Sequence, residues 1–229
     1  MTAILERRGF LIGLAGTGAV LALPGCATVP RYSLTEAIRR LLMIASQNAF
    51  AMLMQPGGFY DNQVARIGLP PQLGGSGAGS VLAVILQSAT FRRRLHWEVN
   101  RAAERGAERA APLVADAIRM MEPEDVAALI GGRPTAATDY LRGRMGPALL
   151  EAMLPGISEG LRLLDDDVVS QALAVATGID FGGLVRDIGE KADNAIWASI
   201  GAEEAAIRAD PRRTDDPLLI GVFGAARGR

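Results

Sequence analysis

The spacing of the apolar residues constrains the fold of this chain more than any other feature. Apolar side chains recur every three to four residues, which is typical of an α-helix with one buried face. This pattern occupies residues 34–52, 113–121, 150–164 and 184–207. No stretch alternates apolar and polar residues with a period of two, as a half-buried strand would. The sequence therefore predicts an all-α fold.

Local signals indicate where some helices begin and end. Ser33 and Glu36 have the spacing of a capping box, which predicts that the first helix begins after Ser33. Pro123 fits the first turn of a helix over residues 126–130. Gly131-Gly132 fits the C-terminal end of that helix, because glycine readily leaves the helical conformation.

Residues 55–80 interrupt the helical pattern. They include Pro56-Gly57-Gly58, Pro70-Pro71 and the glycine-rich run 74–79, which cannot sustain one regular element. A connection of this length is uncommon in a compact domain and is often functional. We predict one long Gly/Pro-rich loop, anchored on the helices by the apolar and aromatic residues Phe59, Tyr60, Ile67 and Leu69.

The N-terminal residues 1–25 have the pattern of a twin-arginine export signal. Arg7 and Arg8 precede Gly9-Phe10-Leu11, and the apolar stretch 11–23 follows. This stretch is shorter than the roughly 20 residues that cross a hydrocarbon core, and its glycines weaken a helix. We therefore predict a cleaved signal peptide rather than a permanent membrane span.

The segment Leu23-Pro24-Gly25-Cys26 resembles a bacterial lipobox, in which the cysteine is acylated and becomes the new N-terminus. The alternative is cleavage after Ala27, which would discard Cys26. With lipidation favoured, the chain divides into a signal peptide (1–25), a short tether (26–32) and one helical domain (33–229). The predicted location is the periplasmic side of a membrane in the cell envelope. The outer membrane is slightly favoured, because Ala27 is not the aspartate associated with inner-membrane retention.

Composition excludes several classes of site. Cys26 is the only cysteine and His96 the only histidine, so thiolate, iron–sulfur and histidine-rich zinc sites are excluded. Asp165-Asp166-Asp167 could attract a hard cation, but consecutive helical residues do not converge on one ion. A net charge of −1, with interspersed charges, argues against a nucleic-acid partner. We therefore expect no cofactor, no metal and no nucleic acid.

Acidic residues allow two interpretations. Two long helical segments carry glutamates that could pack together: Glu98, Glu104, Glu108, Glu203 and Glu204. Carboxylates paired in a cleft can perform acid–base chemistry. However, the i, i+4 spacing of Glu204 and Arg208 is typical of solvent-facing ion pairs, which is the interpretation we favour. His96, between Leu95 and Trp97 in a predicted helix, is expected to be a surface or partly packed residue.

Several short motifs resemble a known bacterial family in order and spacing. The first are Gly58-Phe59-Tyr60-Asp61-Asn62, Ile67-Gly68-Leu69-Pro70, Asn100-Arg101-Ala102-Ala103-Glu104 and Ala136-Ala137-Thr138-Asp139-Tyr140. The C-terminal ones are Ile200-Gly201-Ala202-Glu203-Glu204-Ala205-Ala206-Ile207-Arg208-Ala209-Asp210-Pro211, Arg213-Thr214 and Val222-Phe223-Gly224. Over residues 34 to 224 the chain resembles the bacterial domain of unknown function 4197 family.

The resemblance implies an exported, mostly helical domain with no established activity or catalytic residues. If the family shares a site, its candidates are the polar residues of these motifs: Tyr60, Asn62, Asn100, Glu104, Thr138, Tyr140, Glu204 and Arg208. The alternative is that they attach the long loop to the helices, because a buried polar group without a partner costs about 1–3 kcal/mol. We favour this structural role.

Two functions are compatible with the sequence. The first is a non-enzymatic envelope lipoprotein, held at a membrane by a lipid on Cys26, that binds a protein or an apolar small molecule. Methionines would give such a site an adaptable apolar surface if several line a groove: Met43, Met52, Met54, Met120, Met121, Met145 and Met153. The alternative is a carboxylate-based hydrolase or metal-dependent enzyme, which requires Glu104 and Glu204 within about 10 Å of each other.

Overall fold

The computed structural model describes residues 31–69, 88–162 and 180–225. All regular elements in these ranges are helices, and no strand occurs among them. The predicted all-α fold is therefore confirmed. Several predicted features lie outside the described residues: Arg7, Arg8, Cys26, residues 26–30 of the tether, residues 70–80 of the loop, and Asp165-Asp166-Asp167.

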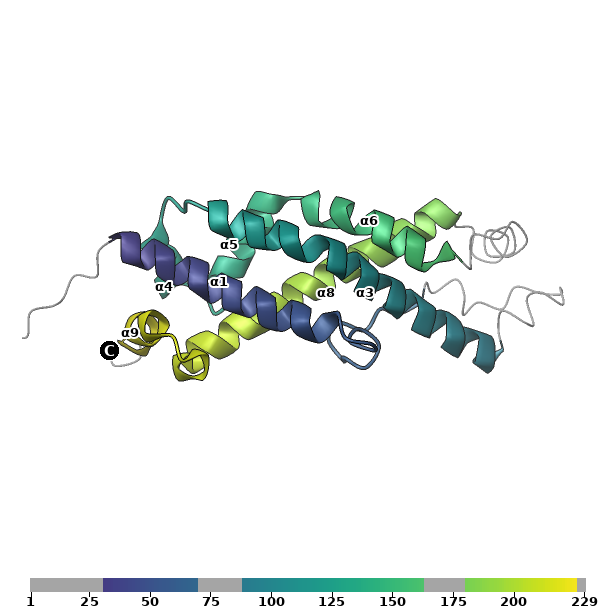
Figure 1. Ribbon diagram of the computed structural model, residues 1–229, viewed down its shortest axis with the longest axis horizontal. Helices are drawn as coiled ribbons and strands as arrows, with labels where there is room; N and C mark the ends of the chain where they lie inside the picture. The colour runs from purple at the N-terminus through teal and green to yellow at the C-terminus, as the bar shows by residue number, and fades with distance from the viewer. Residues whose placement is uncertain (1–30, 70–87, 163–179, 226–229) are drawn as a thin grey trace, which may run out of the picture.

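Four helices form the body of the molecule: α1 (Arg31–Leu53), α3 (Ala89–Met120), α6 (Ala148–Gly160) and α8 (Phe181–Ala209). They run along its long axis, and α8 crosses the others obliquely (Figure 1). Helix α3 packs most extensively against α6, and α1 packs against α8. Further contacts between α1 and α3 and between α6 and α8 complete a helical bundle.

The remaining elements are short: α4 (Val126–Gly131), α5 (Ala136–Met145), the 3-10 helix η3 (Pro211–Thr214) and α9 (Pro217–Ala225). Helices α4 and α9 both contact α1. Figure 1 shows them at the end of the molecule where α1 begins. Helix α5 packs on α8, which brings its N-terminal end against the C-terminal half of that long helix.

The core contains the residues that carry the helical periodicity. On α1, Ile38, Leu41, Ala45 and Ala49 are all 0% exposed, and the apolar stripe of α8 is buried in the same cluster. Met52 departs from the pattern, because this last member of the α1 stripe is 41% exposed. Hydrophobic spacing therefore identifies the buried faces but not where a buried face ends.

The ends of two helices differ from the sequence expectation. Helix α1 begins at Arg31, so Ser33 lies inside it, and the predicted N-cap is wrong. Helix α4 is capped by Asp125, whose side chain accepts the Ala128 N–H at 2.9 Å, while Pro123 precedes the cap. The predicted glycine end is confirmed, since α4 ends at Gly131 and Gly132 is its C-cap residue.

Arginine side chains satisfy carbonyl groups at helix C-terminal ends. Arg39 of α1 donates from Nε and Nη2 to the Met121 carbonyl at 3.2 and 2.8 Å, just after α3. Arg208 of α8 donates to the Ile130 and Leu129 carbonyls at 2.9 and 2.8 Å, at the end of α4. Because the last carbonyls of a helix lack partners within it, these long-range bonds attach α1 to the end of α3 and α8 to the end of α4.

Two prolines lie inside helices, Pro112 in α3 and Pro155 in α6. Proline removes one hydrogen bond to the carbonyl four residues earlier. These carbonyls belong to Glu108 and Glu151, both of which are exposed, so water can solvate them. The prolines therefore do not end the helices.

The crossing of α3 and α6 depends on glycine. A Cβ on Gly156 of α6 would lie 2.7 Å from the Arg105 carbonyl oxygen of α3. A Cβ on Gly106 of α3 would lie 2.8 Å from Cγ1 of Ile157. Both contacts are shorter than side chains tolerate without a shift, so the close approach requires these small residues. Among the described helices, none is long and apolar enough to cross a membrane.

Candidate functional site

The chain after α1 turns back onto the bundle and packs its apolar residues against the helices. Phe59 is 0% and Ile67 2% exposed, and Leu69 packs against the core. Tyr60 is partly buried. The predicted anchors of the loop are therefore confirmed over its described part, residues 55–69.

Asn100 of α3 holds the second half of this loop. Its Oδ1 accepts the Ile67 N–H at 2.9 Å, and its Nδ2 donates to the Ile67 carbonyl at 3.1 Å. Nδ2 also donates to the His96 carbonyl at 2.7 Å. Asn100 is 0% exposed, and this pairing satisfies both backbone groups of a buried loop residue.

Glu104, one helical turn further along α3, holds the first half of the loop. Its carboxylate accepts the Gly57 N–H at 2.9 Å, and the residue is 8% exposed. Burial raises the pKa of Glu104 above its usual value of 4.5, although the amides of Gly57, Phe59 and Gly58 act in the opposite direction. The turn needs glycine at residue 58, because a Cβ there would lie 2.4 Å from the Met52 carbonyl oxygen.

Asn62 and Tyr60 organise the tip of the loop. The Asn62 Oδ1 accepts the N–H groups of Val64 and Ala65 at 2.9 and 3.1 Å, which forms a local turn. The Tyr60 ring contacts two side chains: the Arg66 guanidinium lies 4.7 Å from its centroid, and the His96 ring lies 5.2 Å away in an edge-on arrangement. The prediction of a partly packed His96 is confirmed; among the described residues its buried Nε2 has no hydrogen-bond partner.

A second polar cluster surrounds Glu204 of α8. Its carboxylate accepts the backbone N–H groups of Ala137 and Thr138 at 3.1 and 2.7 Å. The Thr138 hydroxyl donates to it at 2.6 Å, and the Arg208 Nε donates at 2.8 Å. The carboxylate therefore caps the N-terminal end of α5, where unpaired N–H groups and the helix dipole favour a negative charge.

The prediction of a solvent-facing pair between Glu204 and Arg208 is wrong. The Glu204 side chain is 0% and the Arg208 side chain 10% exposed. The two residues do form an i, i+4 ion pair, but their spacing does not show that α5 covers this face of α8. Because both charges are paired and hydrogen-bonded, the structure accommodates them in its interior.

Seven of the eight candidate polar residues form two clusters instead of one site, and Tyr140 belongs to neither. Asn100 and Glu104 bind the loop that carries Tyr60 and Asn62, whereas Thr138 and Arg208 surround Glu204. Tyr140 packs against the core from α5. Glu104 and Glu204 bond to different elements and share no hydrogen-bond partner. Among the described residues, no group of three or more His, Cys, Asp or Glu side chains could hold a metal ion.

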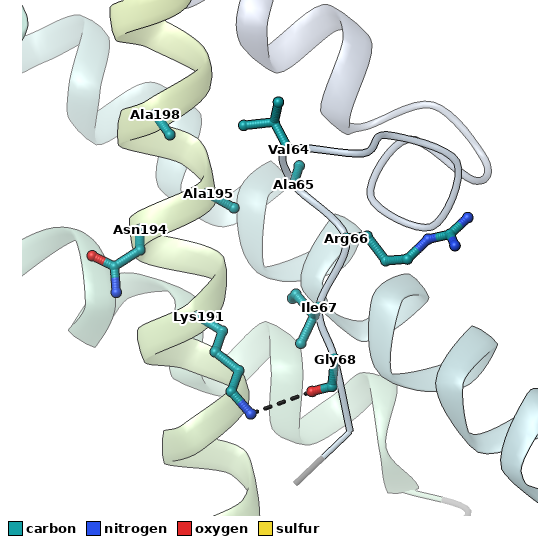
Figure 2. A pocket seen from close by; sticks show the side chains of 9 residues that line it. All are labelled: Val64, Ala65, Arg66, Ile67, Gly68, Lys191, Asn194, Ala195 and Ala198. Atoms are coloured by element: carbon teal, nitrogen blue, oxygen red, sulfur yellow. Dashed lines mark hydrogen bonds between the residues drawn. The ribbon is translucent and has the colours of Figure 1, made fainter. Parts of the chain in front are cut away.

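An open groove lies between the loop and α8 (Figure 2). Its volume is about 440 Å³, and it is lined by Val64, Ala65, Arg66, Ile67, Gly68, Lys191, Asn194, Ala195 and Ala198. Figure 2 shows residues 64–68 along one side and the α8 residues along the other, with the Arg66 side chain directed away from α8. Most of the lining is aliphatic, which suits an apolar ligand better than a charged one.

Lys191 closes one end of the groove. Its ammonium donates to the Gly68 carbonyl at 3.2 Å and forms an ion pair with Asp187 at 2.7 Å. The sequence pattern did not predict Lys191, the only lysine of the chain, or the α8 alanines as lining residues. Alanines in a helix carry no sequence signal for a groove, because the opposite wall is supplied by a loop far away in the sequence.

The methionines do not line this groove. Met121 and Met153 are buried in the core, and Met43, Met54 and Met145 pack at its edge. Met52 and Met120 are 41% and 75% exposed. Most of the described methionines therefore fill gaps in helix packing.

Comparison with known proteins identifies a family but no characterised relative. No curated protein and no solved structure matches the chain. A family model described as a protein of unknown function, DUF4197, matches residues 28–224. This range includes every described helix except the last residue of α9, both polar clusters and the groove. The chain therefore belongs to the DUF4197 family.

Proposed function

We propose that this protein is a non-enzymatic envelope lipoprotein, anchored to a membrane through Cys26, whose helical domain binds an apolar small molecule in the groove between residues 64–68 and α8. The observation that carries the binding function is the groove itself. Its volume of about 440 Å³ falls within the range of small-molecule sites. Its aliphatic walls would remove an apolar ligand from water.

The polar clusters support a structural role for the residues that could otherwise perform catalysis. Asn100 and Glu104 hold the loop that forms one wall of the groove, and none of the eight candidate polar residues lines it. The carboxylate oxygens of Glu204 accept hydrogen bonds within the protein. The alternative of a carboxylate-based hydrolase or metal-dependent enzyme therefore has less support than a binding module.

The lipid anchor rests on the sequence of residues 7–26. An acylated cysteine at the mature N-terminus would hold the domain at a membrane surface and remove its only thiol from other chemistry. Metabolic labelling with a radioactive fatty acid tests this directly. We expect label on the wild-type protein and none on the Cys26→Ala variant. Equal labelling of both proteins would exclude the anchor.

Native mass spectrometry of protein extracted from the envelope tests the groove. We expect a small apolar molecule to remain bound to the wild-type chain. The Ala198→Phe variant should lose it, because the new ring fills the groove from an exposed position of α8. The matched control is Ala202→Phe, on an exposed position of the same helix outside the groove lining.

Two outcomes would contradict a small-molecule site. The wild-type protein could be free of ligand under all extraction conditions, or both phenylalanine variants could retain the ligand equally. Co-purification of a protein that Ala198→Phe releases would indicate that the groove binds a polypeptide instead.

A further inference from the structure

The N-terminal half of α3 presents a basic face with an exposed tryptophan. Arg93, Arg94 and Arg101 lie three or four residues from Trp97, which places the four side chains on one side of the helix. All four residues are exposed, and Trp97 is 41% exposed. The Arg101 guanidinium lies over the Trp97 ring, 5.1 Å from its centroid. These four residues are called the Arg–Trp face.

Two of the three arginines of this face have no charged partner among the described residues. Within the described ranges, neither Arg93 nor Arg94 forms an ion pair or a hydrogen bond. Other exposed arginines do form ion pairs, including Arg119 with Asp116 and Arg133 with Asp139. Although the net charge of the whole chain is −1, Arg93 and Arg94 form a local concentration of cations that no described residue pairs with.

Charge balance along the helix supports the same conclusion. Residues 89–105 contain five arginines and two glutamates, in a chain whose net charge is −1. Glu104 is buried, accepts the Gly57 N–H and acts electrostatically on Arg101, and with Glu98 it offsets two of the five arginine charges, which leaves an excess of three positive charges in this segment. An anionic partner is the electrostatic complement of this segment.

We propose that the Arg–Trp face docks on an anionic phospholipid surface. Tryptophan is favoured at the boundary between lipid and water, because its ring is apolar while its N–H remains hydrated. Guanidinium groups bind phosphate well and are attracted to anionic lipid surfaces. This docking rests on the proposed lipid anchor in one respect. A tether through Cys26 would keep a membrane surface near the Arg–Trp face, at a high effective concentration.

Docking would also orient the domain. Figure 1 shows α1 beginning at one end of the molecule and α3 beginning at the opposite end. An anchor that precedes α1 and a contact through the start of α3 would therefore act at opposite ends. The long axis of the bundle would then lie along the membrane instead of pointing away from it.

The test uses the full chain as purified from the envelope, reconstituted with vesicles whose acyl chains carry bromine, a fluorescence quencher. One set contains phosphatidylcholine alone, and the other also contains anionic phosphatidylglycerol. A lipid anchor is the same in both sets, so it does not contribute to the difference between them. We expect strong quenching of Trp97 only with the anionic vesicles, and weaker quenching at high salt.

The two tryptophans provide an internal control. Trp197 is 3% exposed in the core, so bromine should not reach it. The Trp97→Phe variant should therefore lose the quenching, whereas Trp197→Phe should retain it. A signal that follows Trp197 would indicate unfolding on the vesicles and would overturn the proposal.

Charge variants separate the face from the net charge of the protein. Because each arginine near an anionic membrane contributes about fivefold in binding, Arg93→Gln with Arg94→Gln should weaken docking by more than about tenfold. The control, Arg119→Gln with Arg133→Gln, removes the same charge from exposed, ion-paired positions and should stay within about twofold. Equal losses in the two double variants would overturn the proposal.

Three further outcomes separate docking on anionic lipid from binding to neutral lipid, from a protein partner and from the lipid anchor. Equal quenching with neutral and anionic vesicles would exclude recognition of anionic lipid. Binding of an acidic polypeptide through Arg93 and Arg94, without binding to anionic vesicles, would assign the face to a protein partner and refute lipid docking. Failure of acylation at Cys26 would refute only the anchor, because unlipidated protein added to the same vesicles allows the same comparison.

Discussion

The Glu204 carboxylate and its partner Arg208 together hold the ends of two helices. The carboxylate accepts the N–H groups at the start of α5, while Arg208 binds the carbonyls at the end of α4. A glutamine in place of Glu204 would place its NH2 group against the N–H donors that the carboxylate accepts. It would also leave the Arg208 charge without its partner. This buried pair is therefore the residue-scale feature on which the packing of α4 and α5 against α8 depends.

We expect Glu204→Gln to lower the free energy of unfolding by about 3 kcal/mol or more, as when one partner of a buried ion pair is removed. The matched control is Glu159→Gln, which breaks an exposed pair with Arg109 and should cost less than about 1 kcal/mol. Urea denaturation followed by far-UV circular dichroism measures both values. Equal midpoints for the two variants would contradict the structural role of Glu204.

Glu104 makes the stability of the protein depend on pH in a defined direction. Burial raises its pKa in the folded state above the unfolded value of about 4.5. The folded state then binds more protons than the unfolded state between these two pKa values, so this group's contribution to stability falls as pH rises through that interval. Below the unfolded pKa its contribution is at its most favourable.

The Glu104→Gln variant should lack this pH dependence, because glutamine does not titrate. The free energy of unfolding of the wild type, minus that of the variant, should decrease as the pH is raised from about 4.5 toward neutrality. Urea titrations of both proteins across this pH range measure the difference. A difference that stays constant or increases with pH would show that the folded-state pKa of Glu104 is not raised.

At the scale of elements, the approach of α3 to α6 depends on glycines that the sequence alone identifies only as weak helix formers. Gly156 faces the Arg105 carbonyl oxygen across the crossing, whereas nothing lies within 4 Å of a Cβ on Gly143 of α5. The same glycine-to-alanine change should therefore have opposite effects at the two sites. Both substitutions raise the helix propensity, but only the one at Gly156 creates a steric clash.

Gly156→Ala should destabilise the protein by about 1–3 kcal/mol, since the added methyl group forces two helix backbones apart. Gly143→Ala should stabilise it by about 0.5–1 kcal/mol, because alanine is the better helix former at an exposed position. Thermal or urea unfolding of the two variants measures both effects. A stabilising Gly156→Ala would contradict the close crossing.

At the scale of the whole molecule, the C-terminal helix belongs to the same core as the long helices. Leu219 and Phe223 of α9 are 0% and 3% exposed within the main hydrophobic cluster, and the Arg208 guanidinium lies 4.9 Å from the centroid of the Phe223 ring. Shared packing of this kind favours cooperative unfolding. The short terminal helix is thus a part of the bundle, and not an appendage to it.

Phe223→Ala should lower the free energy of unfolding by about 3 kcal/mol, as when a buried phenylalanine is truncated. The loss should appear in one transition, with Trp197 fluorescence and far-UV circular dichroism changing at the same urea concentration. A separate early transition in circular dichroism, without a change at Trp197, would show that α9 unfolds independently.

The sequence predicts the helices well and the candidate site poorly. Apolar spacing identifies α1, α6 and α8 because a helix buries residues that are close together in the chain. The loop anchors Phe59 and Ile67 were also predictable, since apolar residues in a polar loop need a buried position. The solvent-facing interpretation of Glu204 failed because burial on α8 depends on α5, which lies about 65 residues earlier in the chain.

The sequence by itself determined the helical class, the break after α1 and the family, because periodicity, glycine and proline content, and ordered motifs are local properties of the chain. Only the tertiary structure decided what the polar residues do. Hydrogen bonds such as those of Asn100 to Ile67 and of Glu204 to Thr138 join segments that are distant in sequence. The groove and the Arg–Trp face likewise depend on which surfaces the packed helices leave uncovered, and residue spacing does not contain that information.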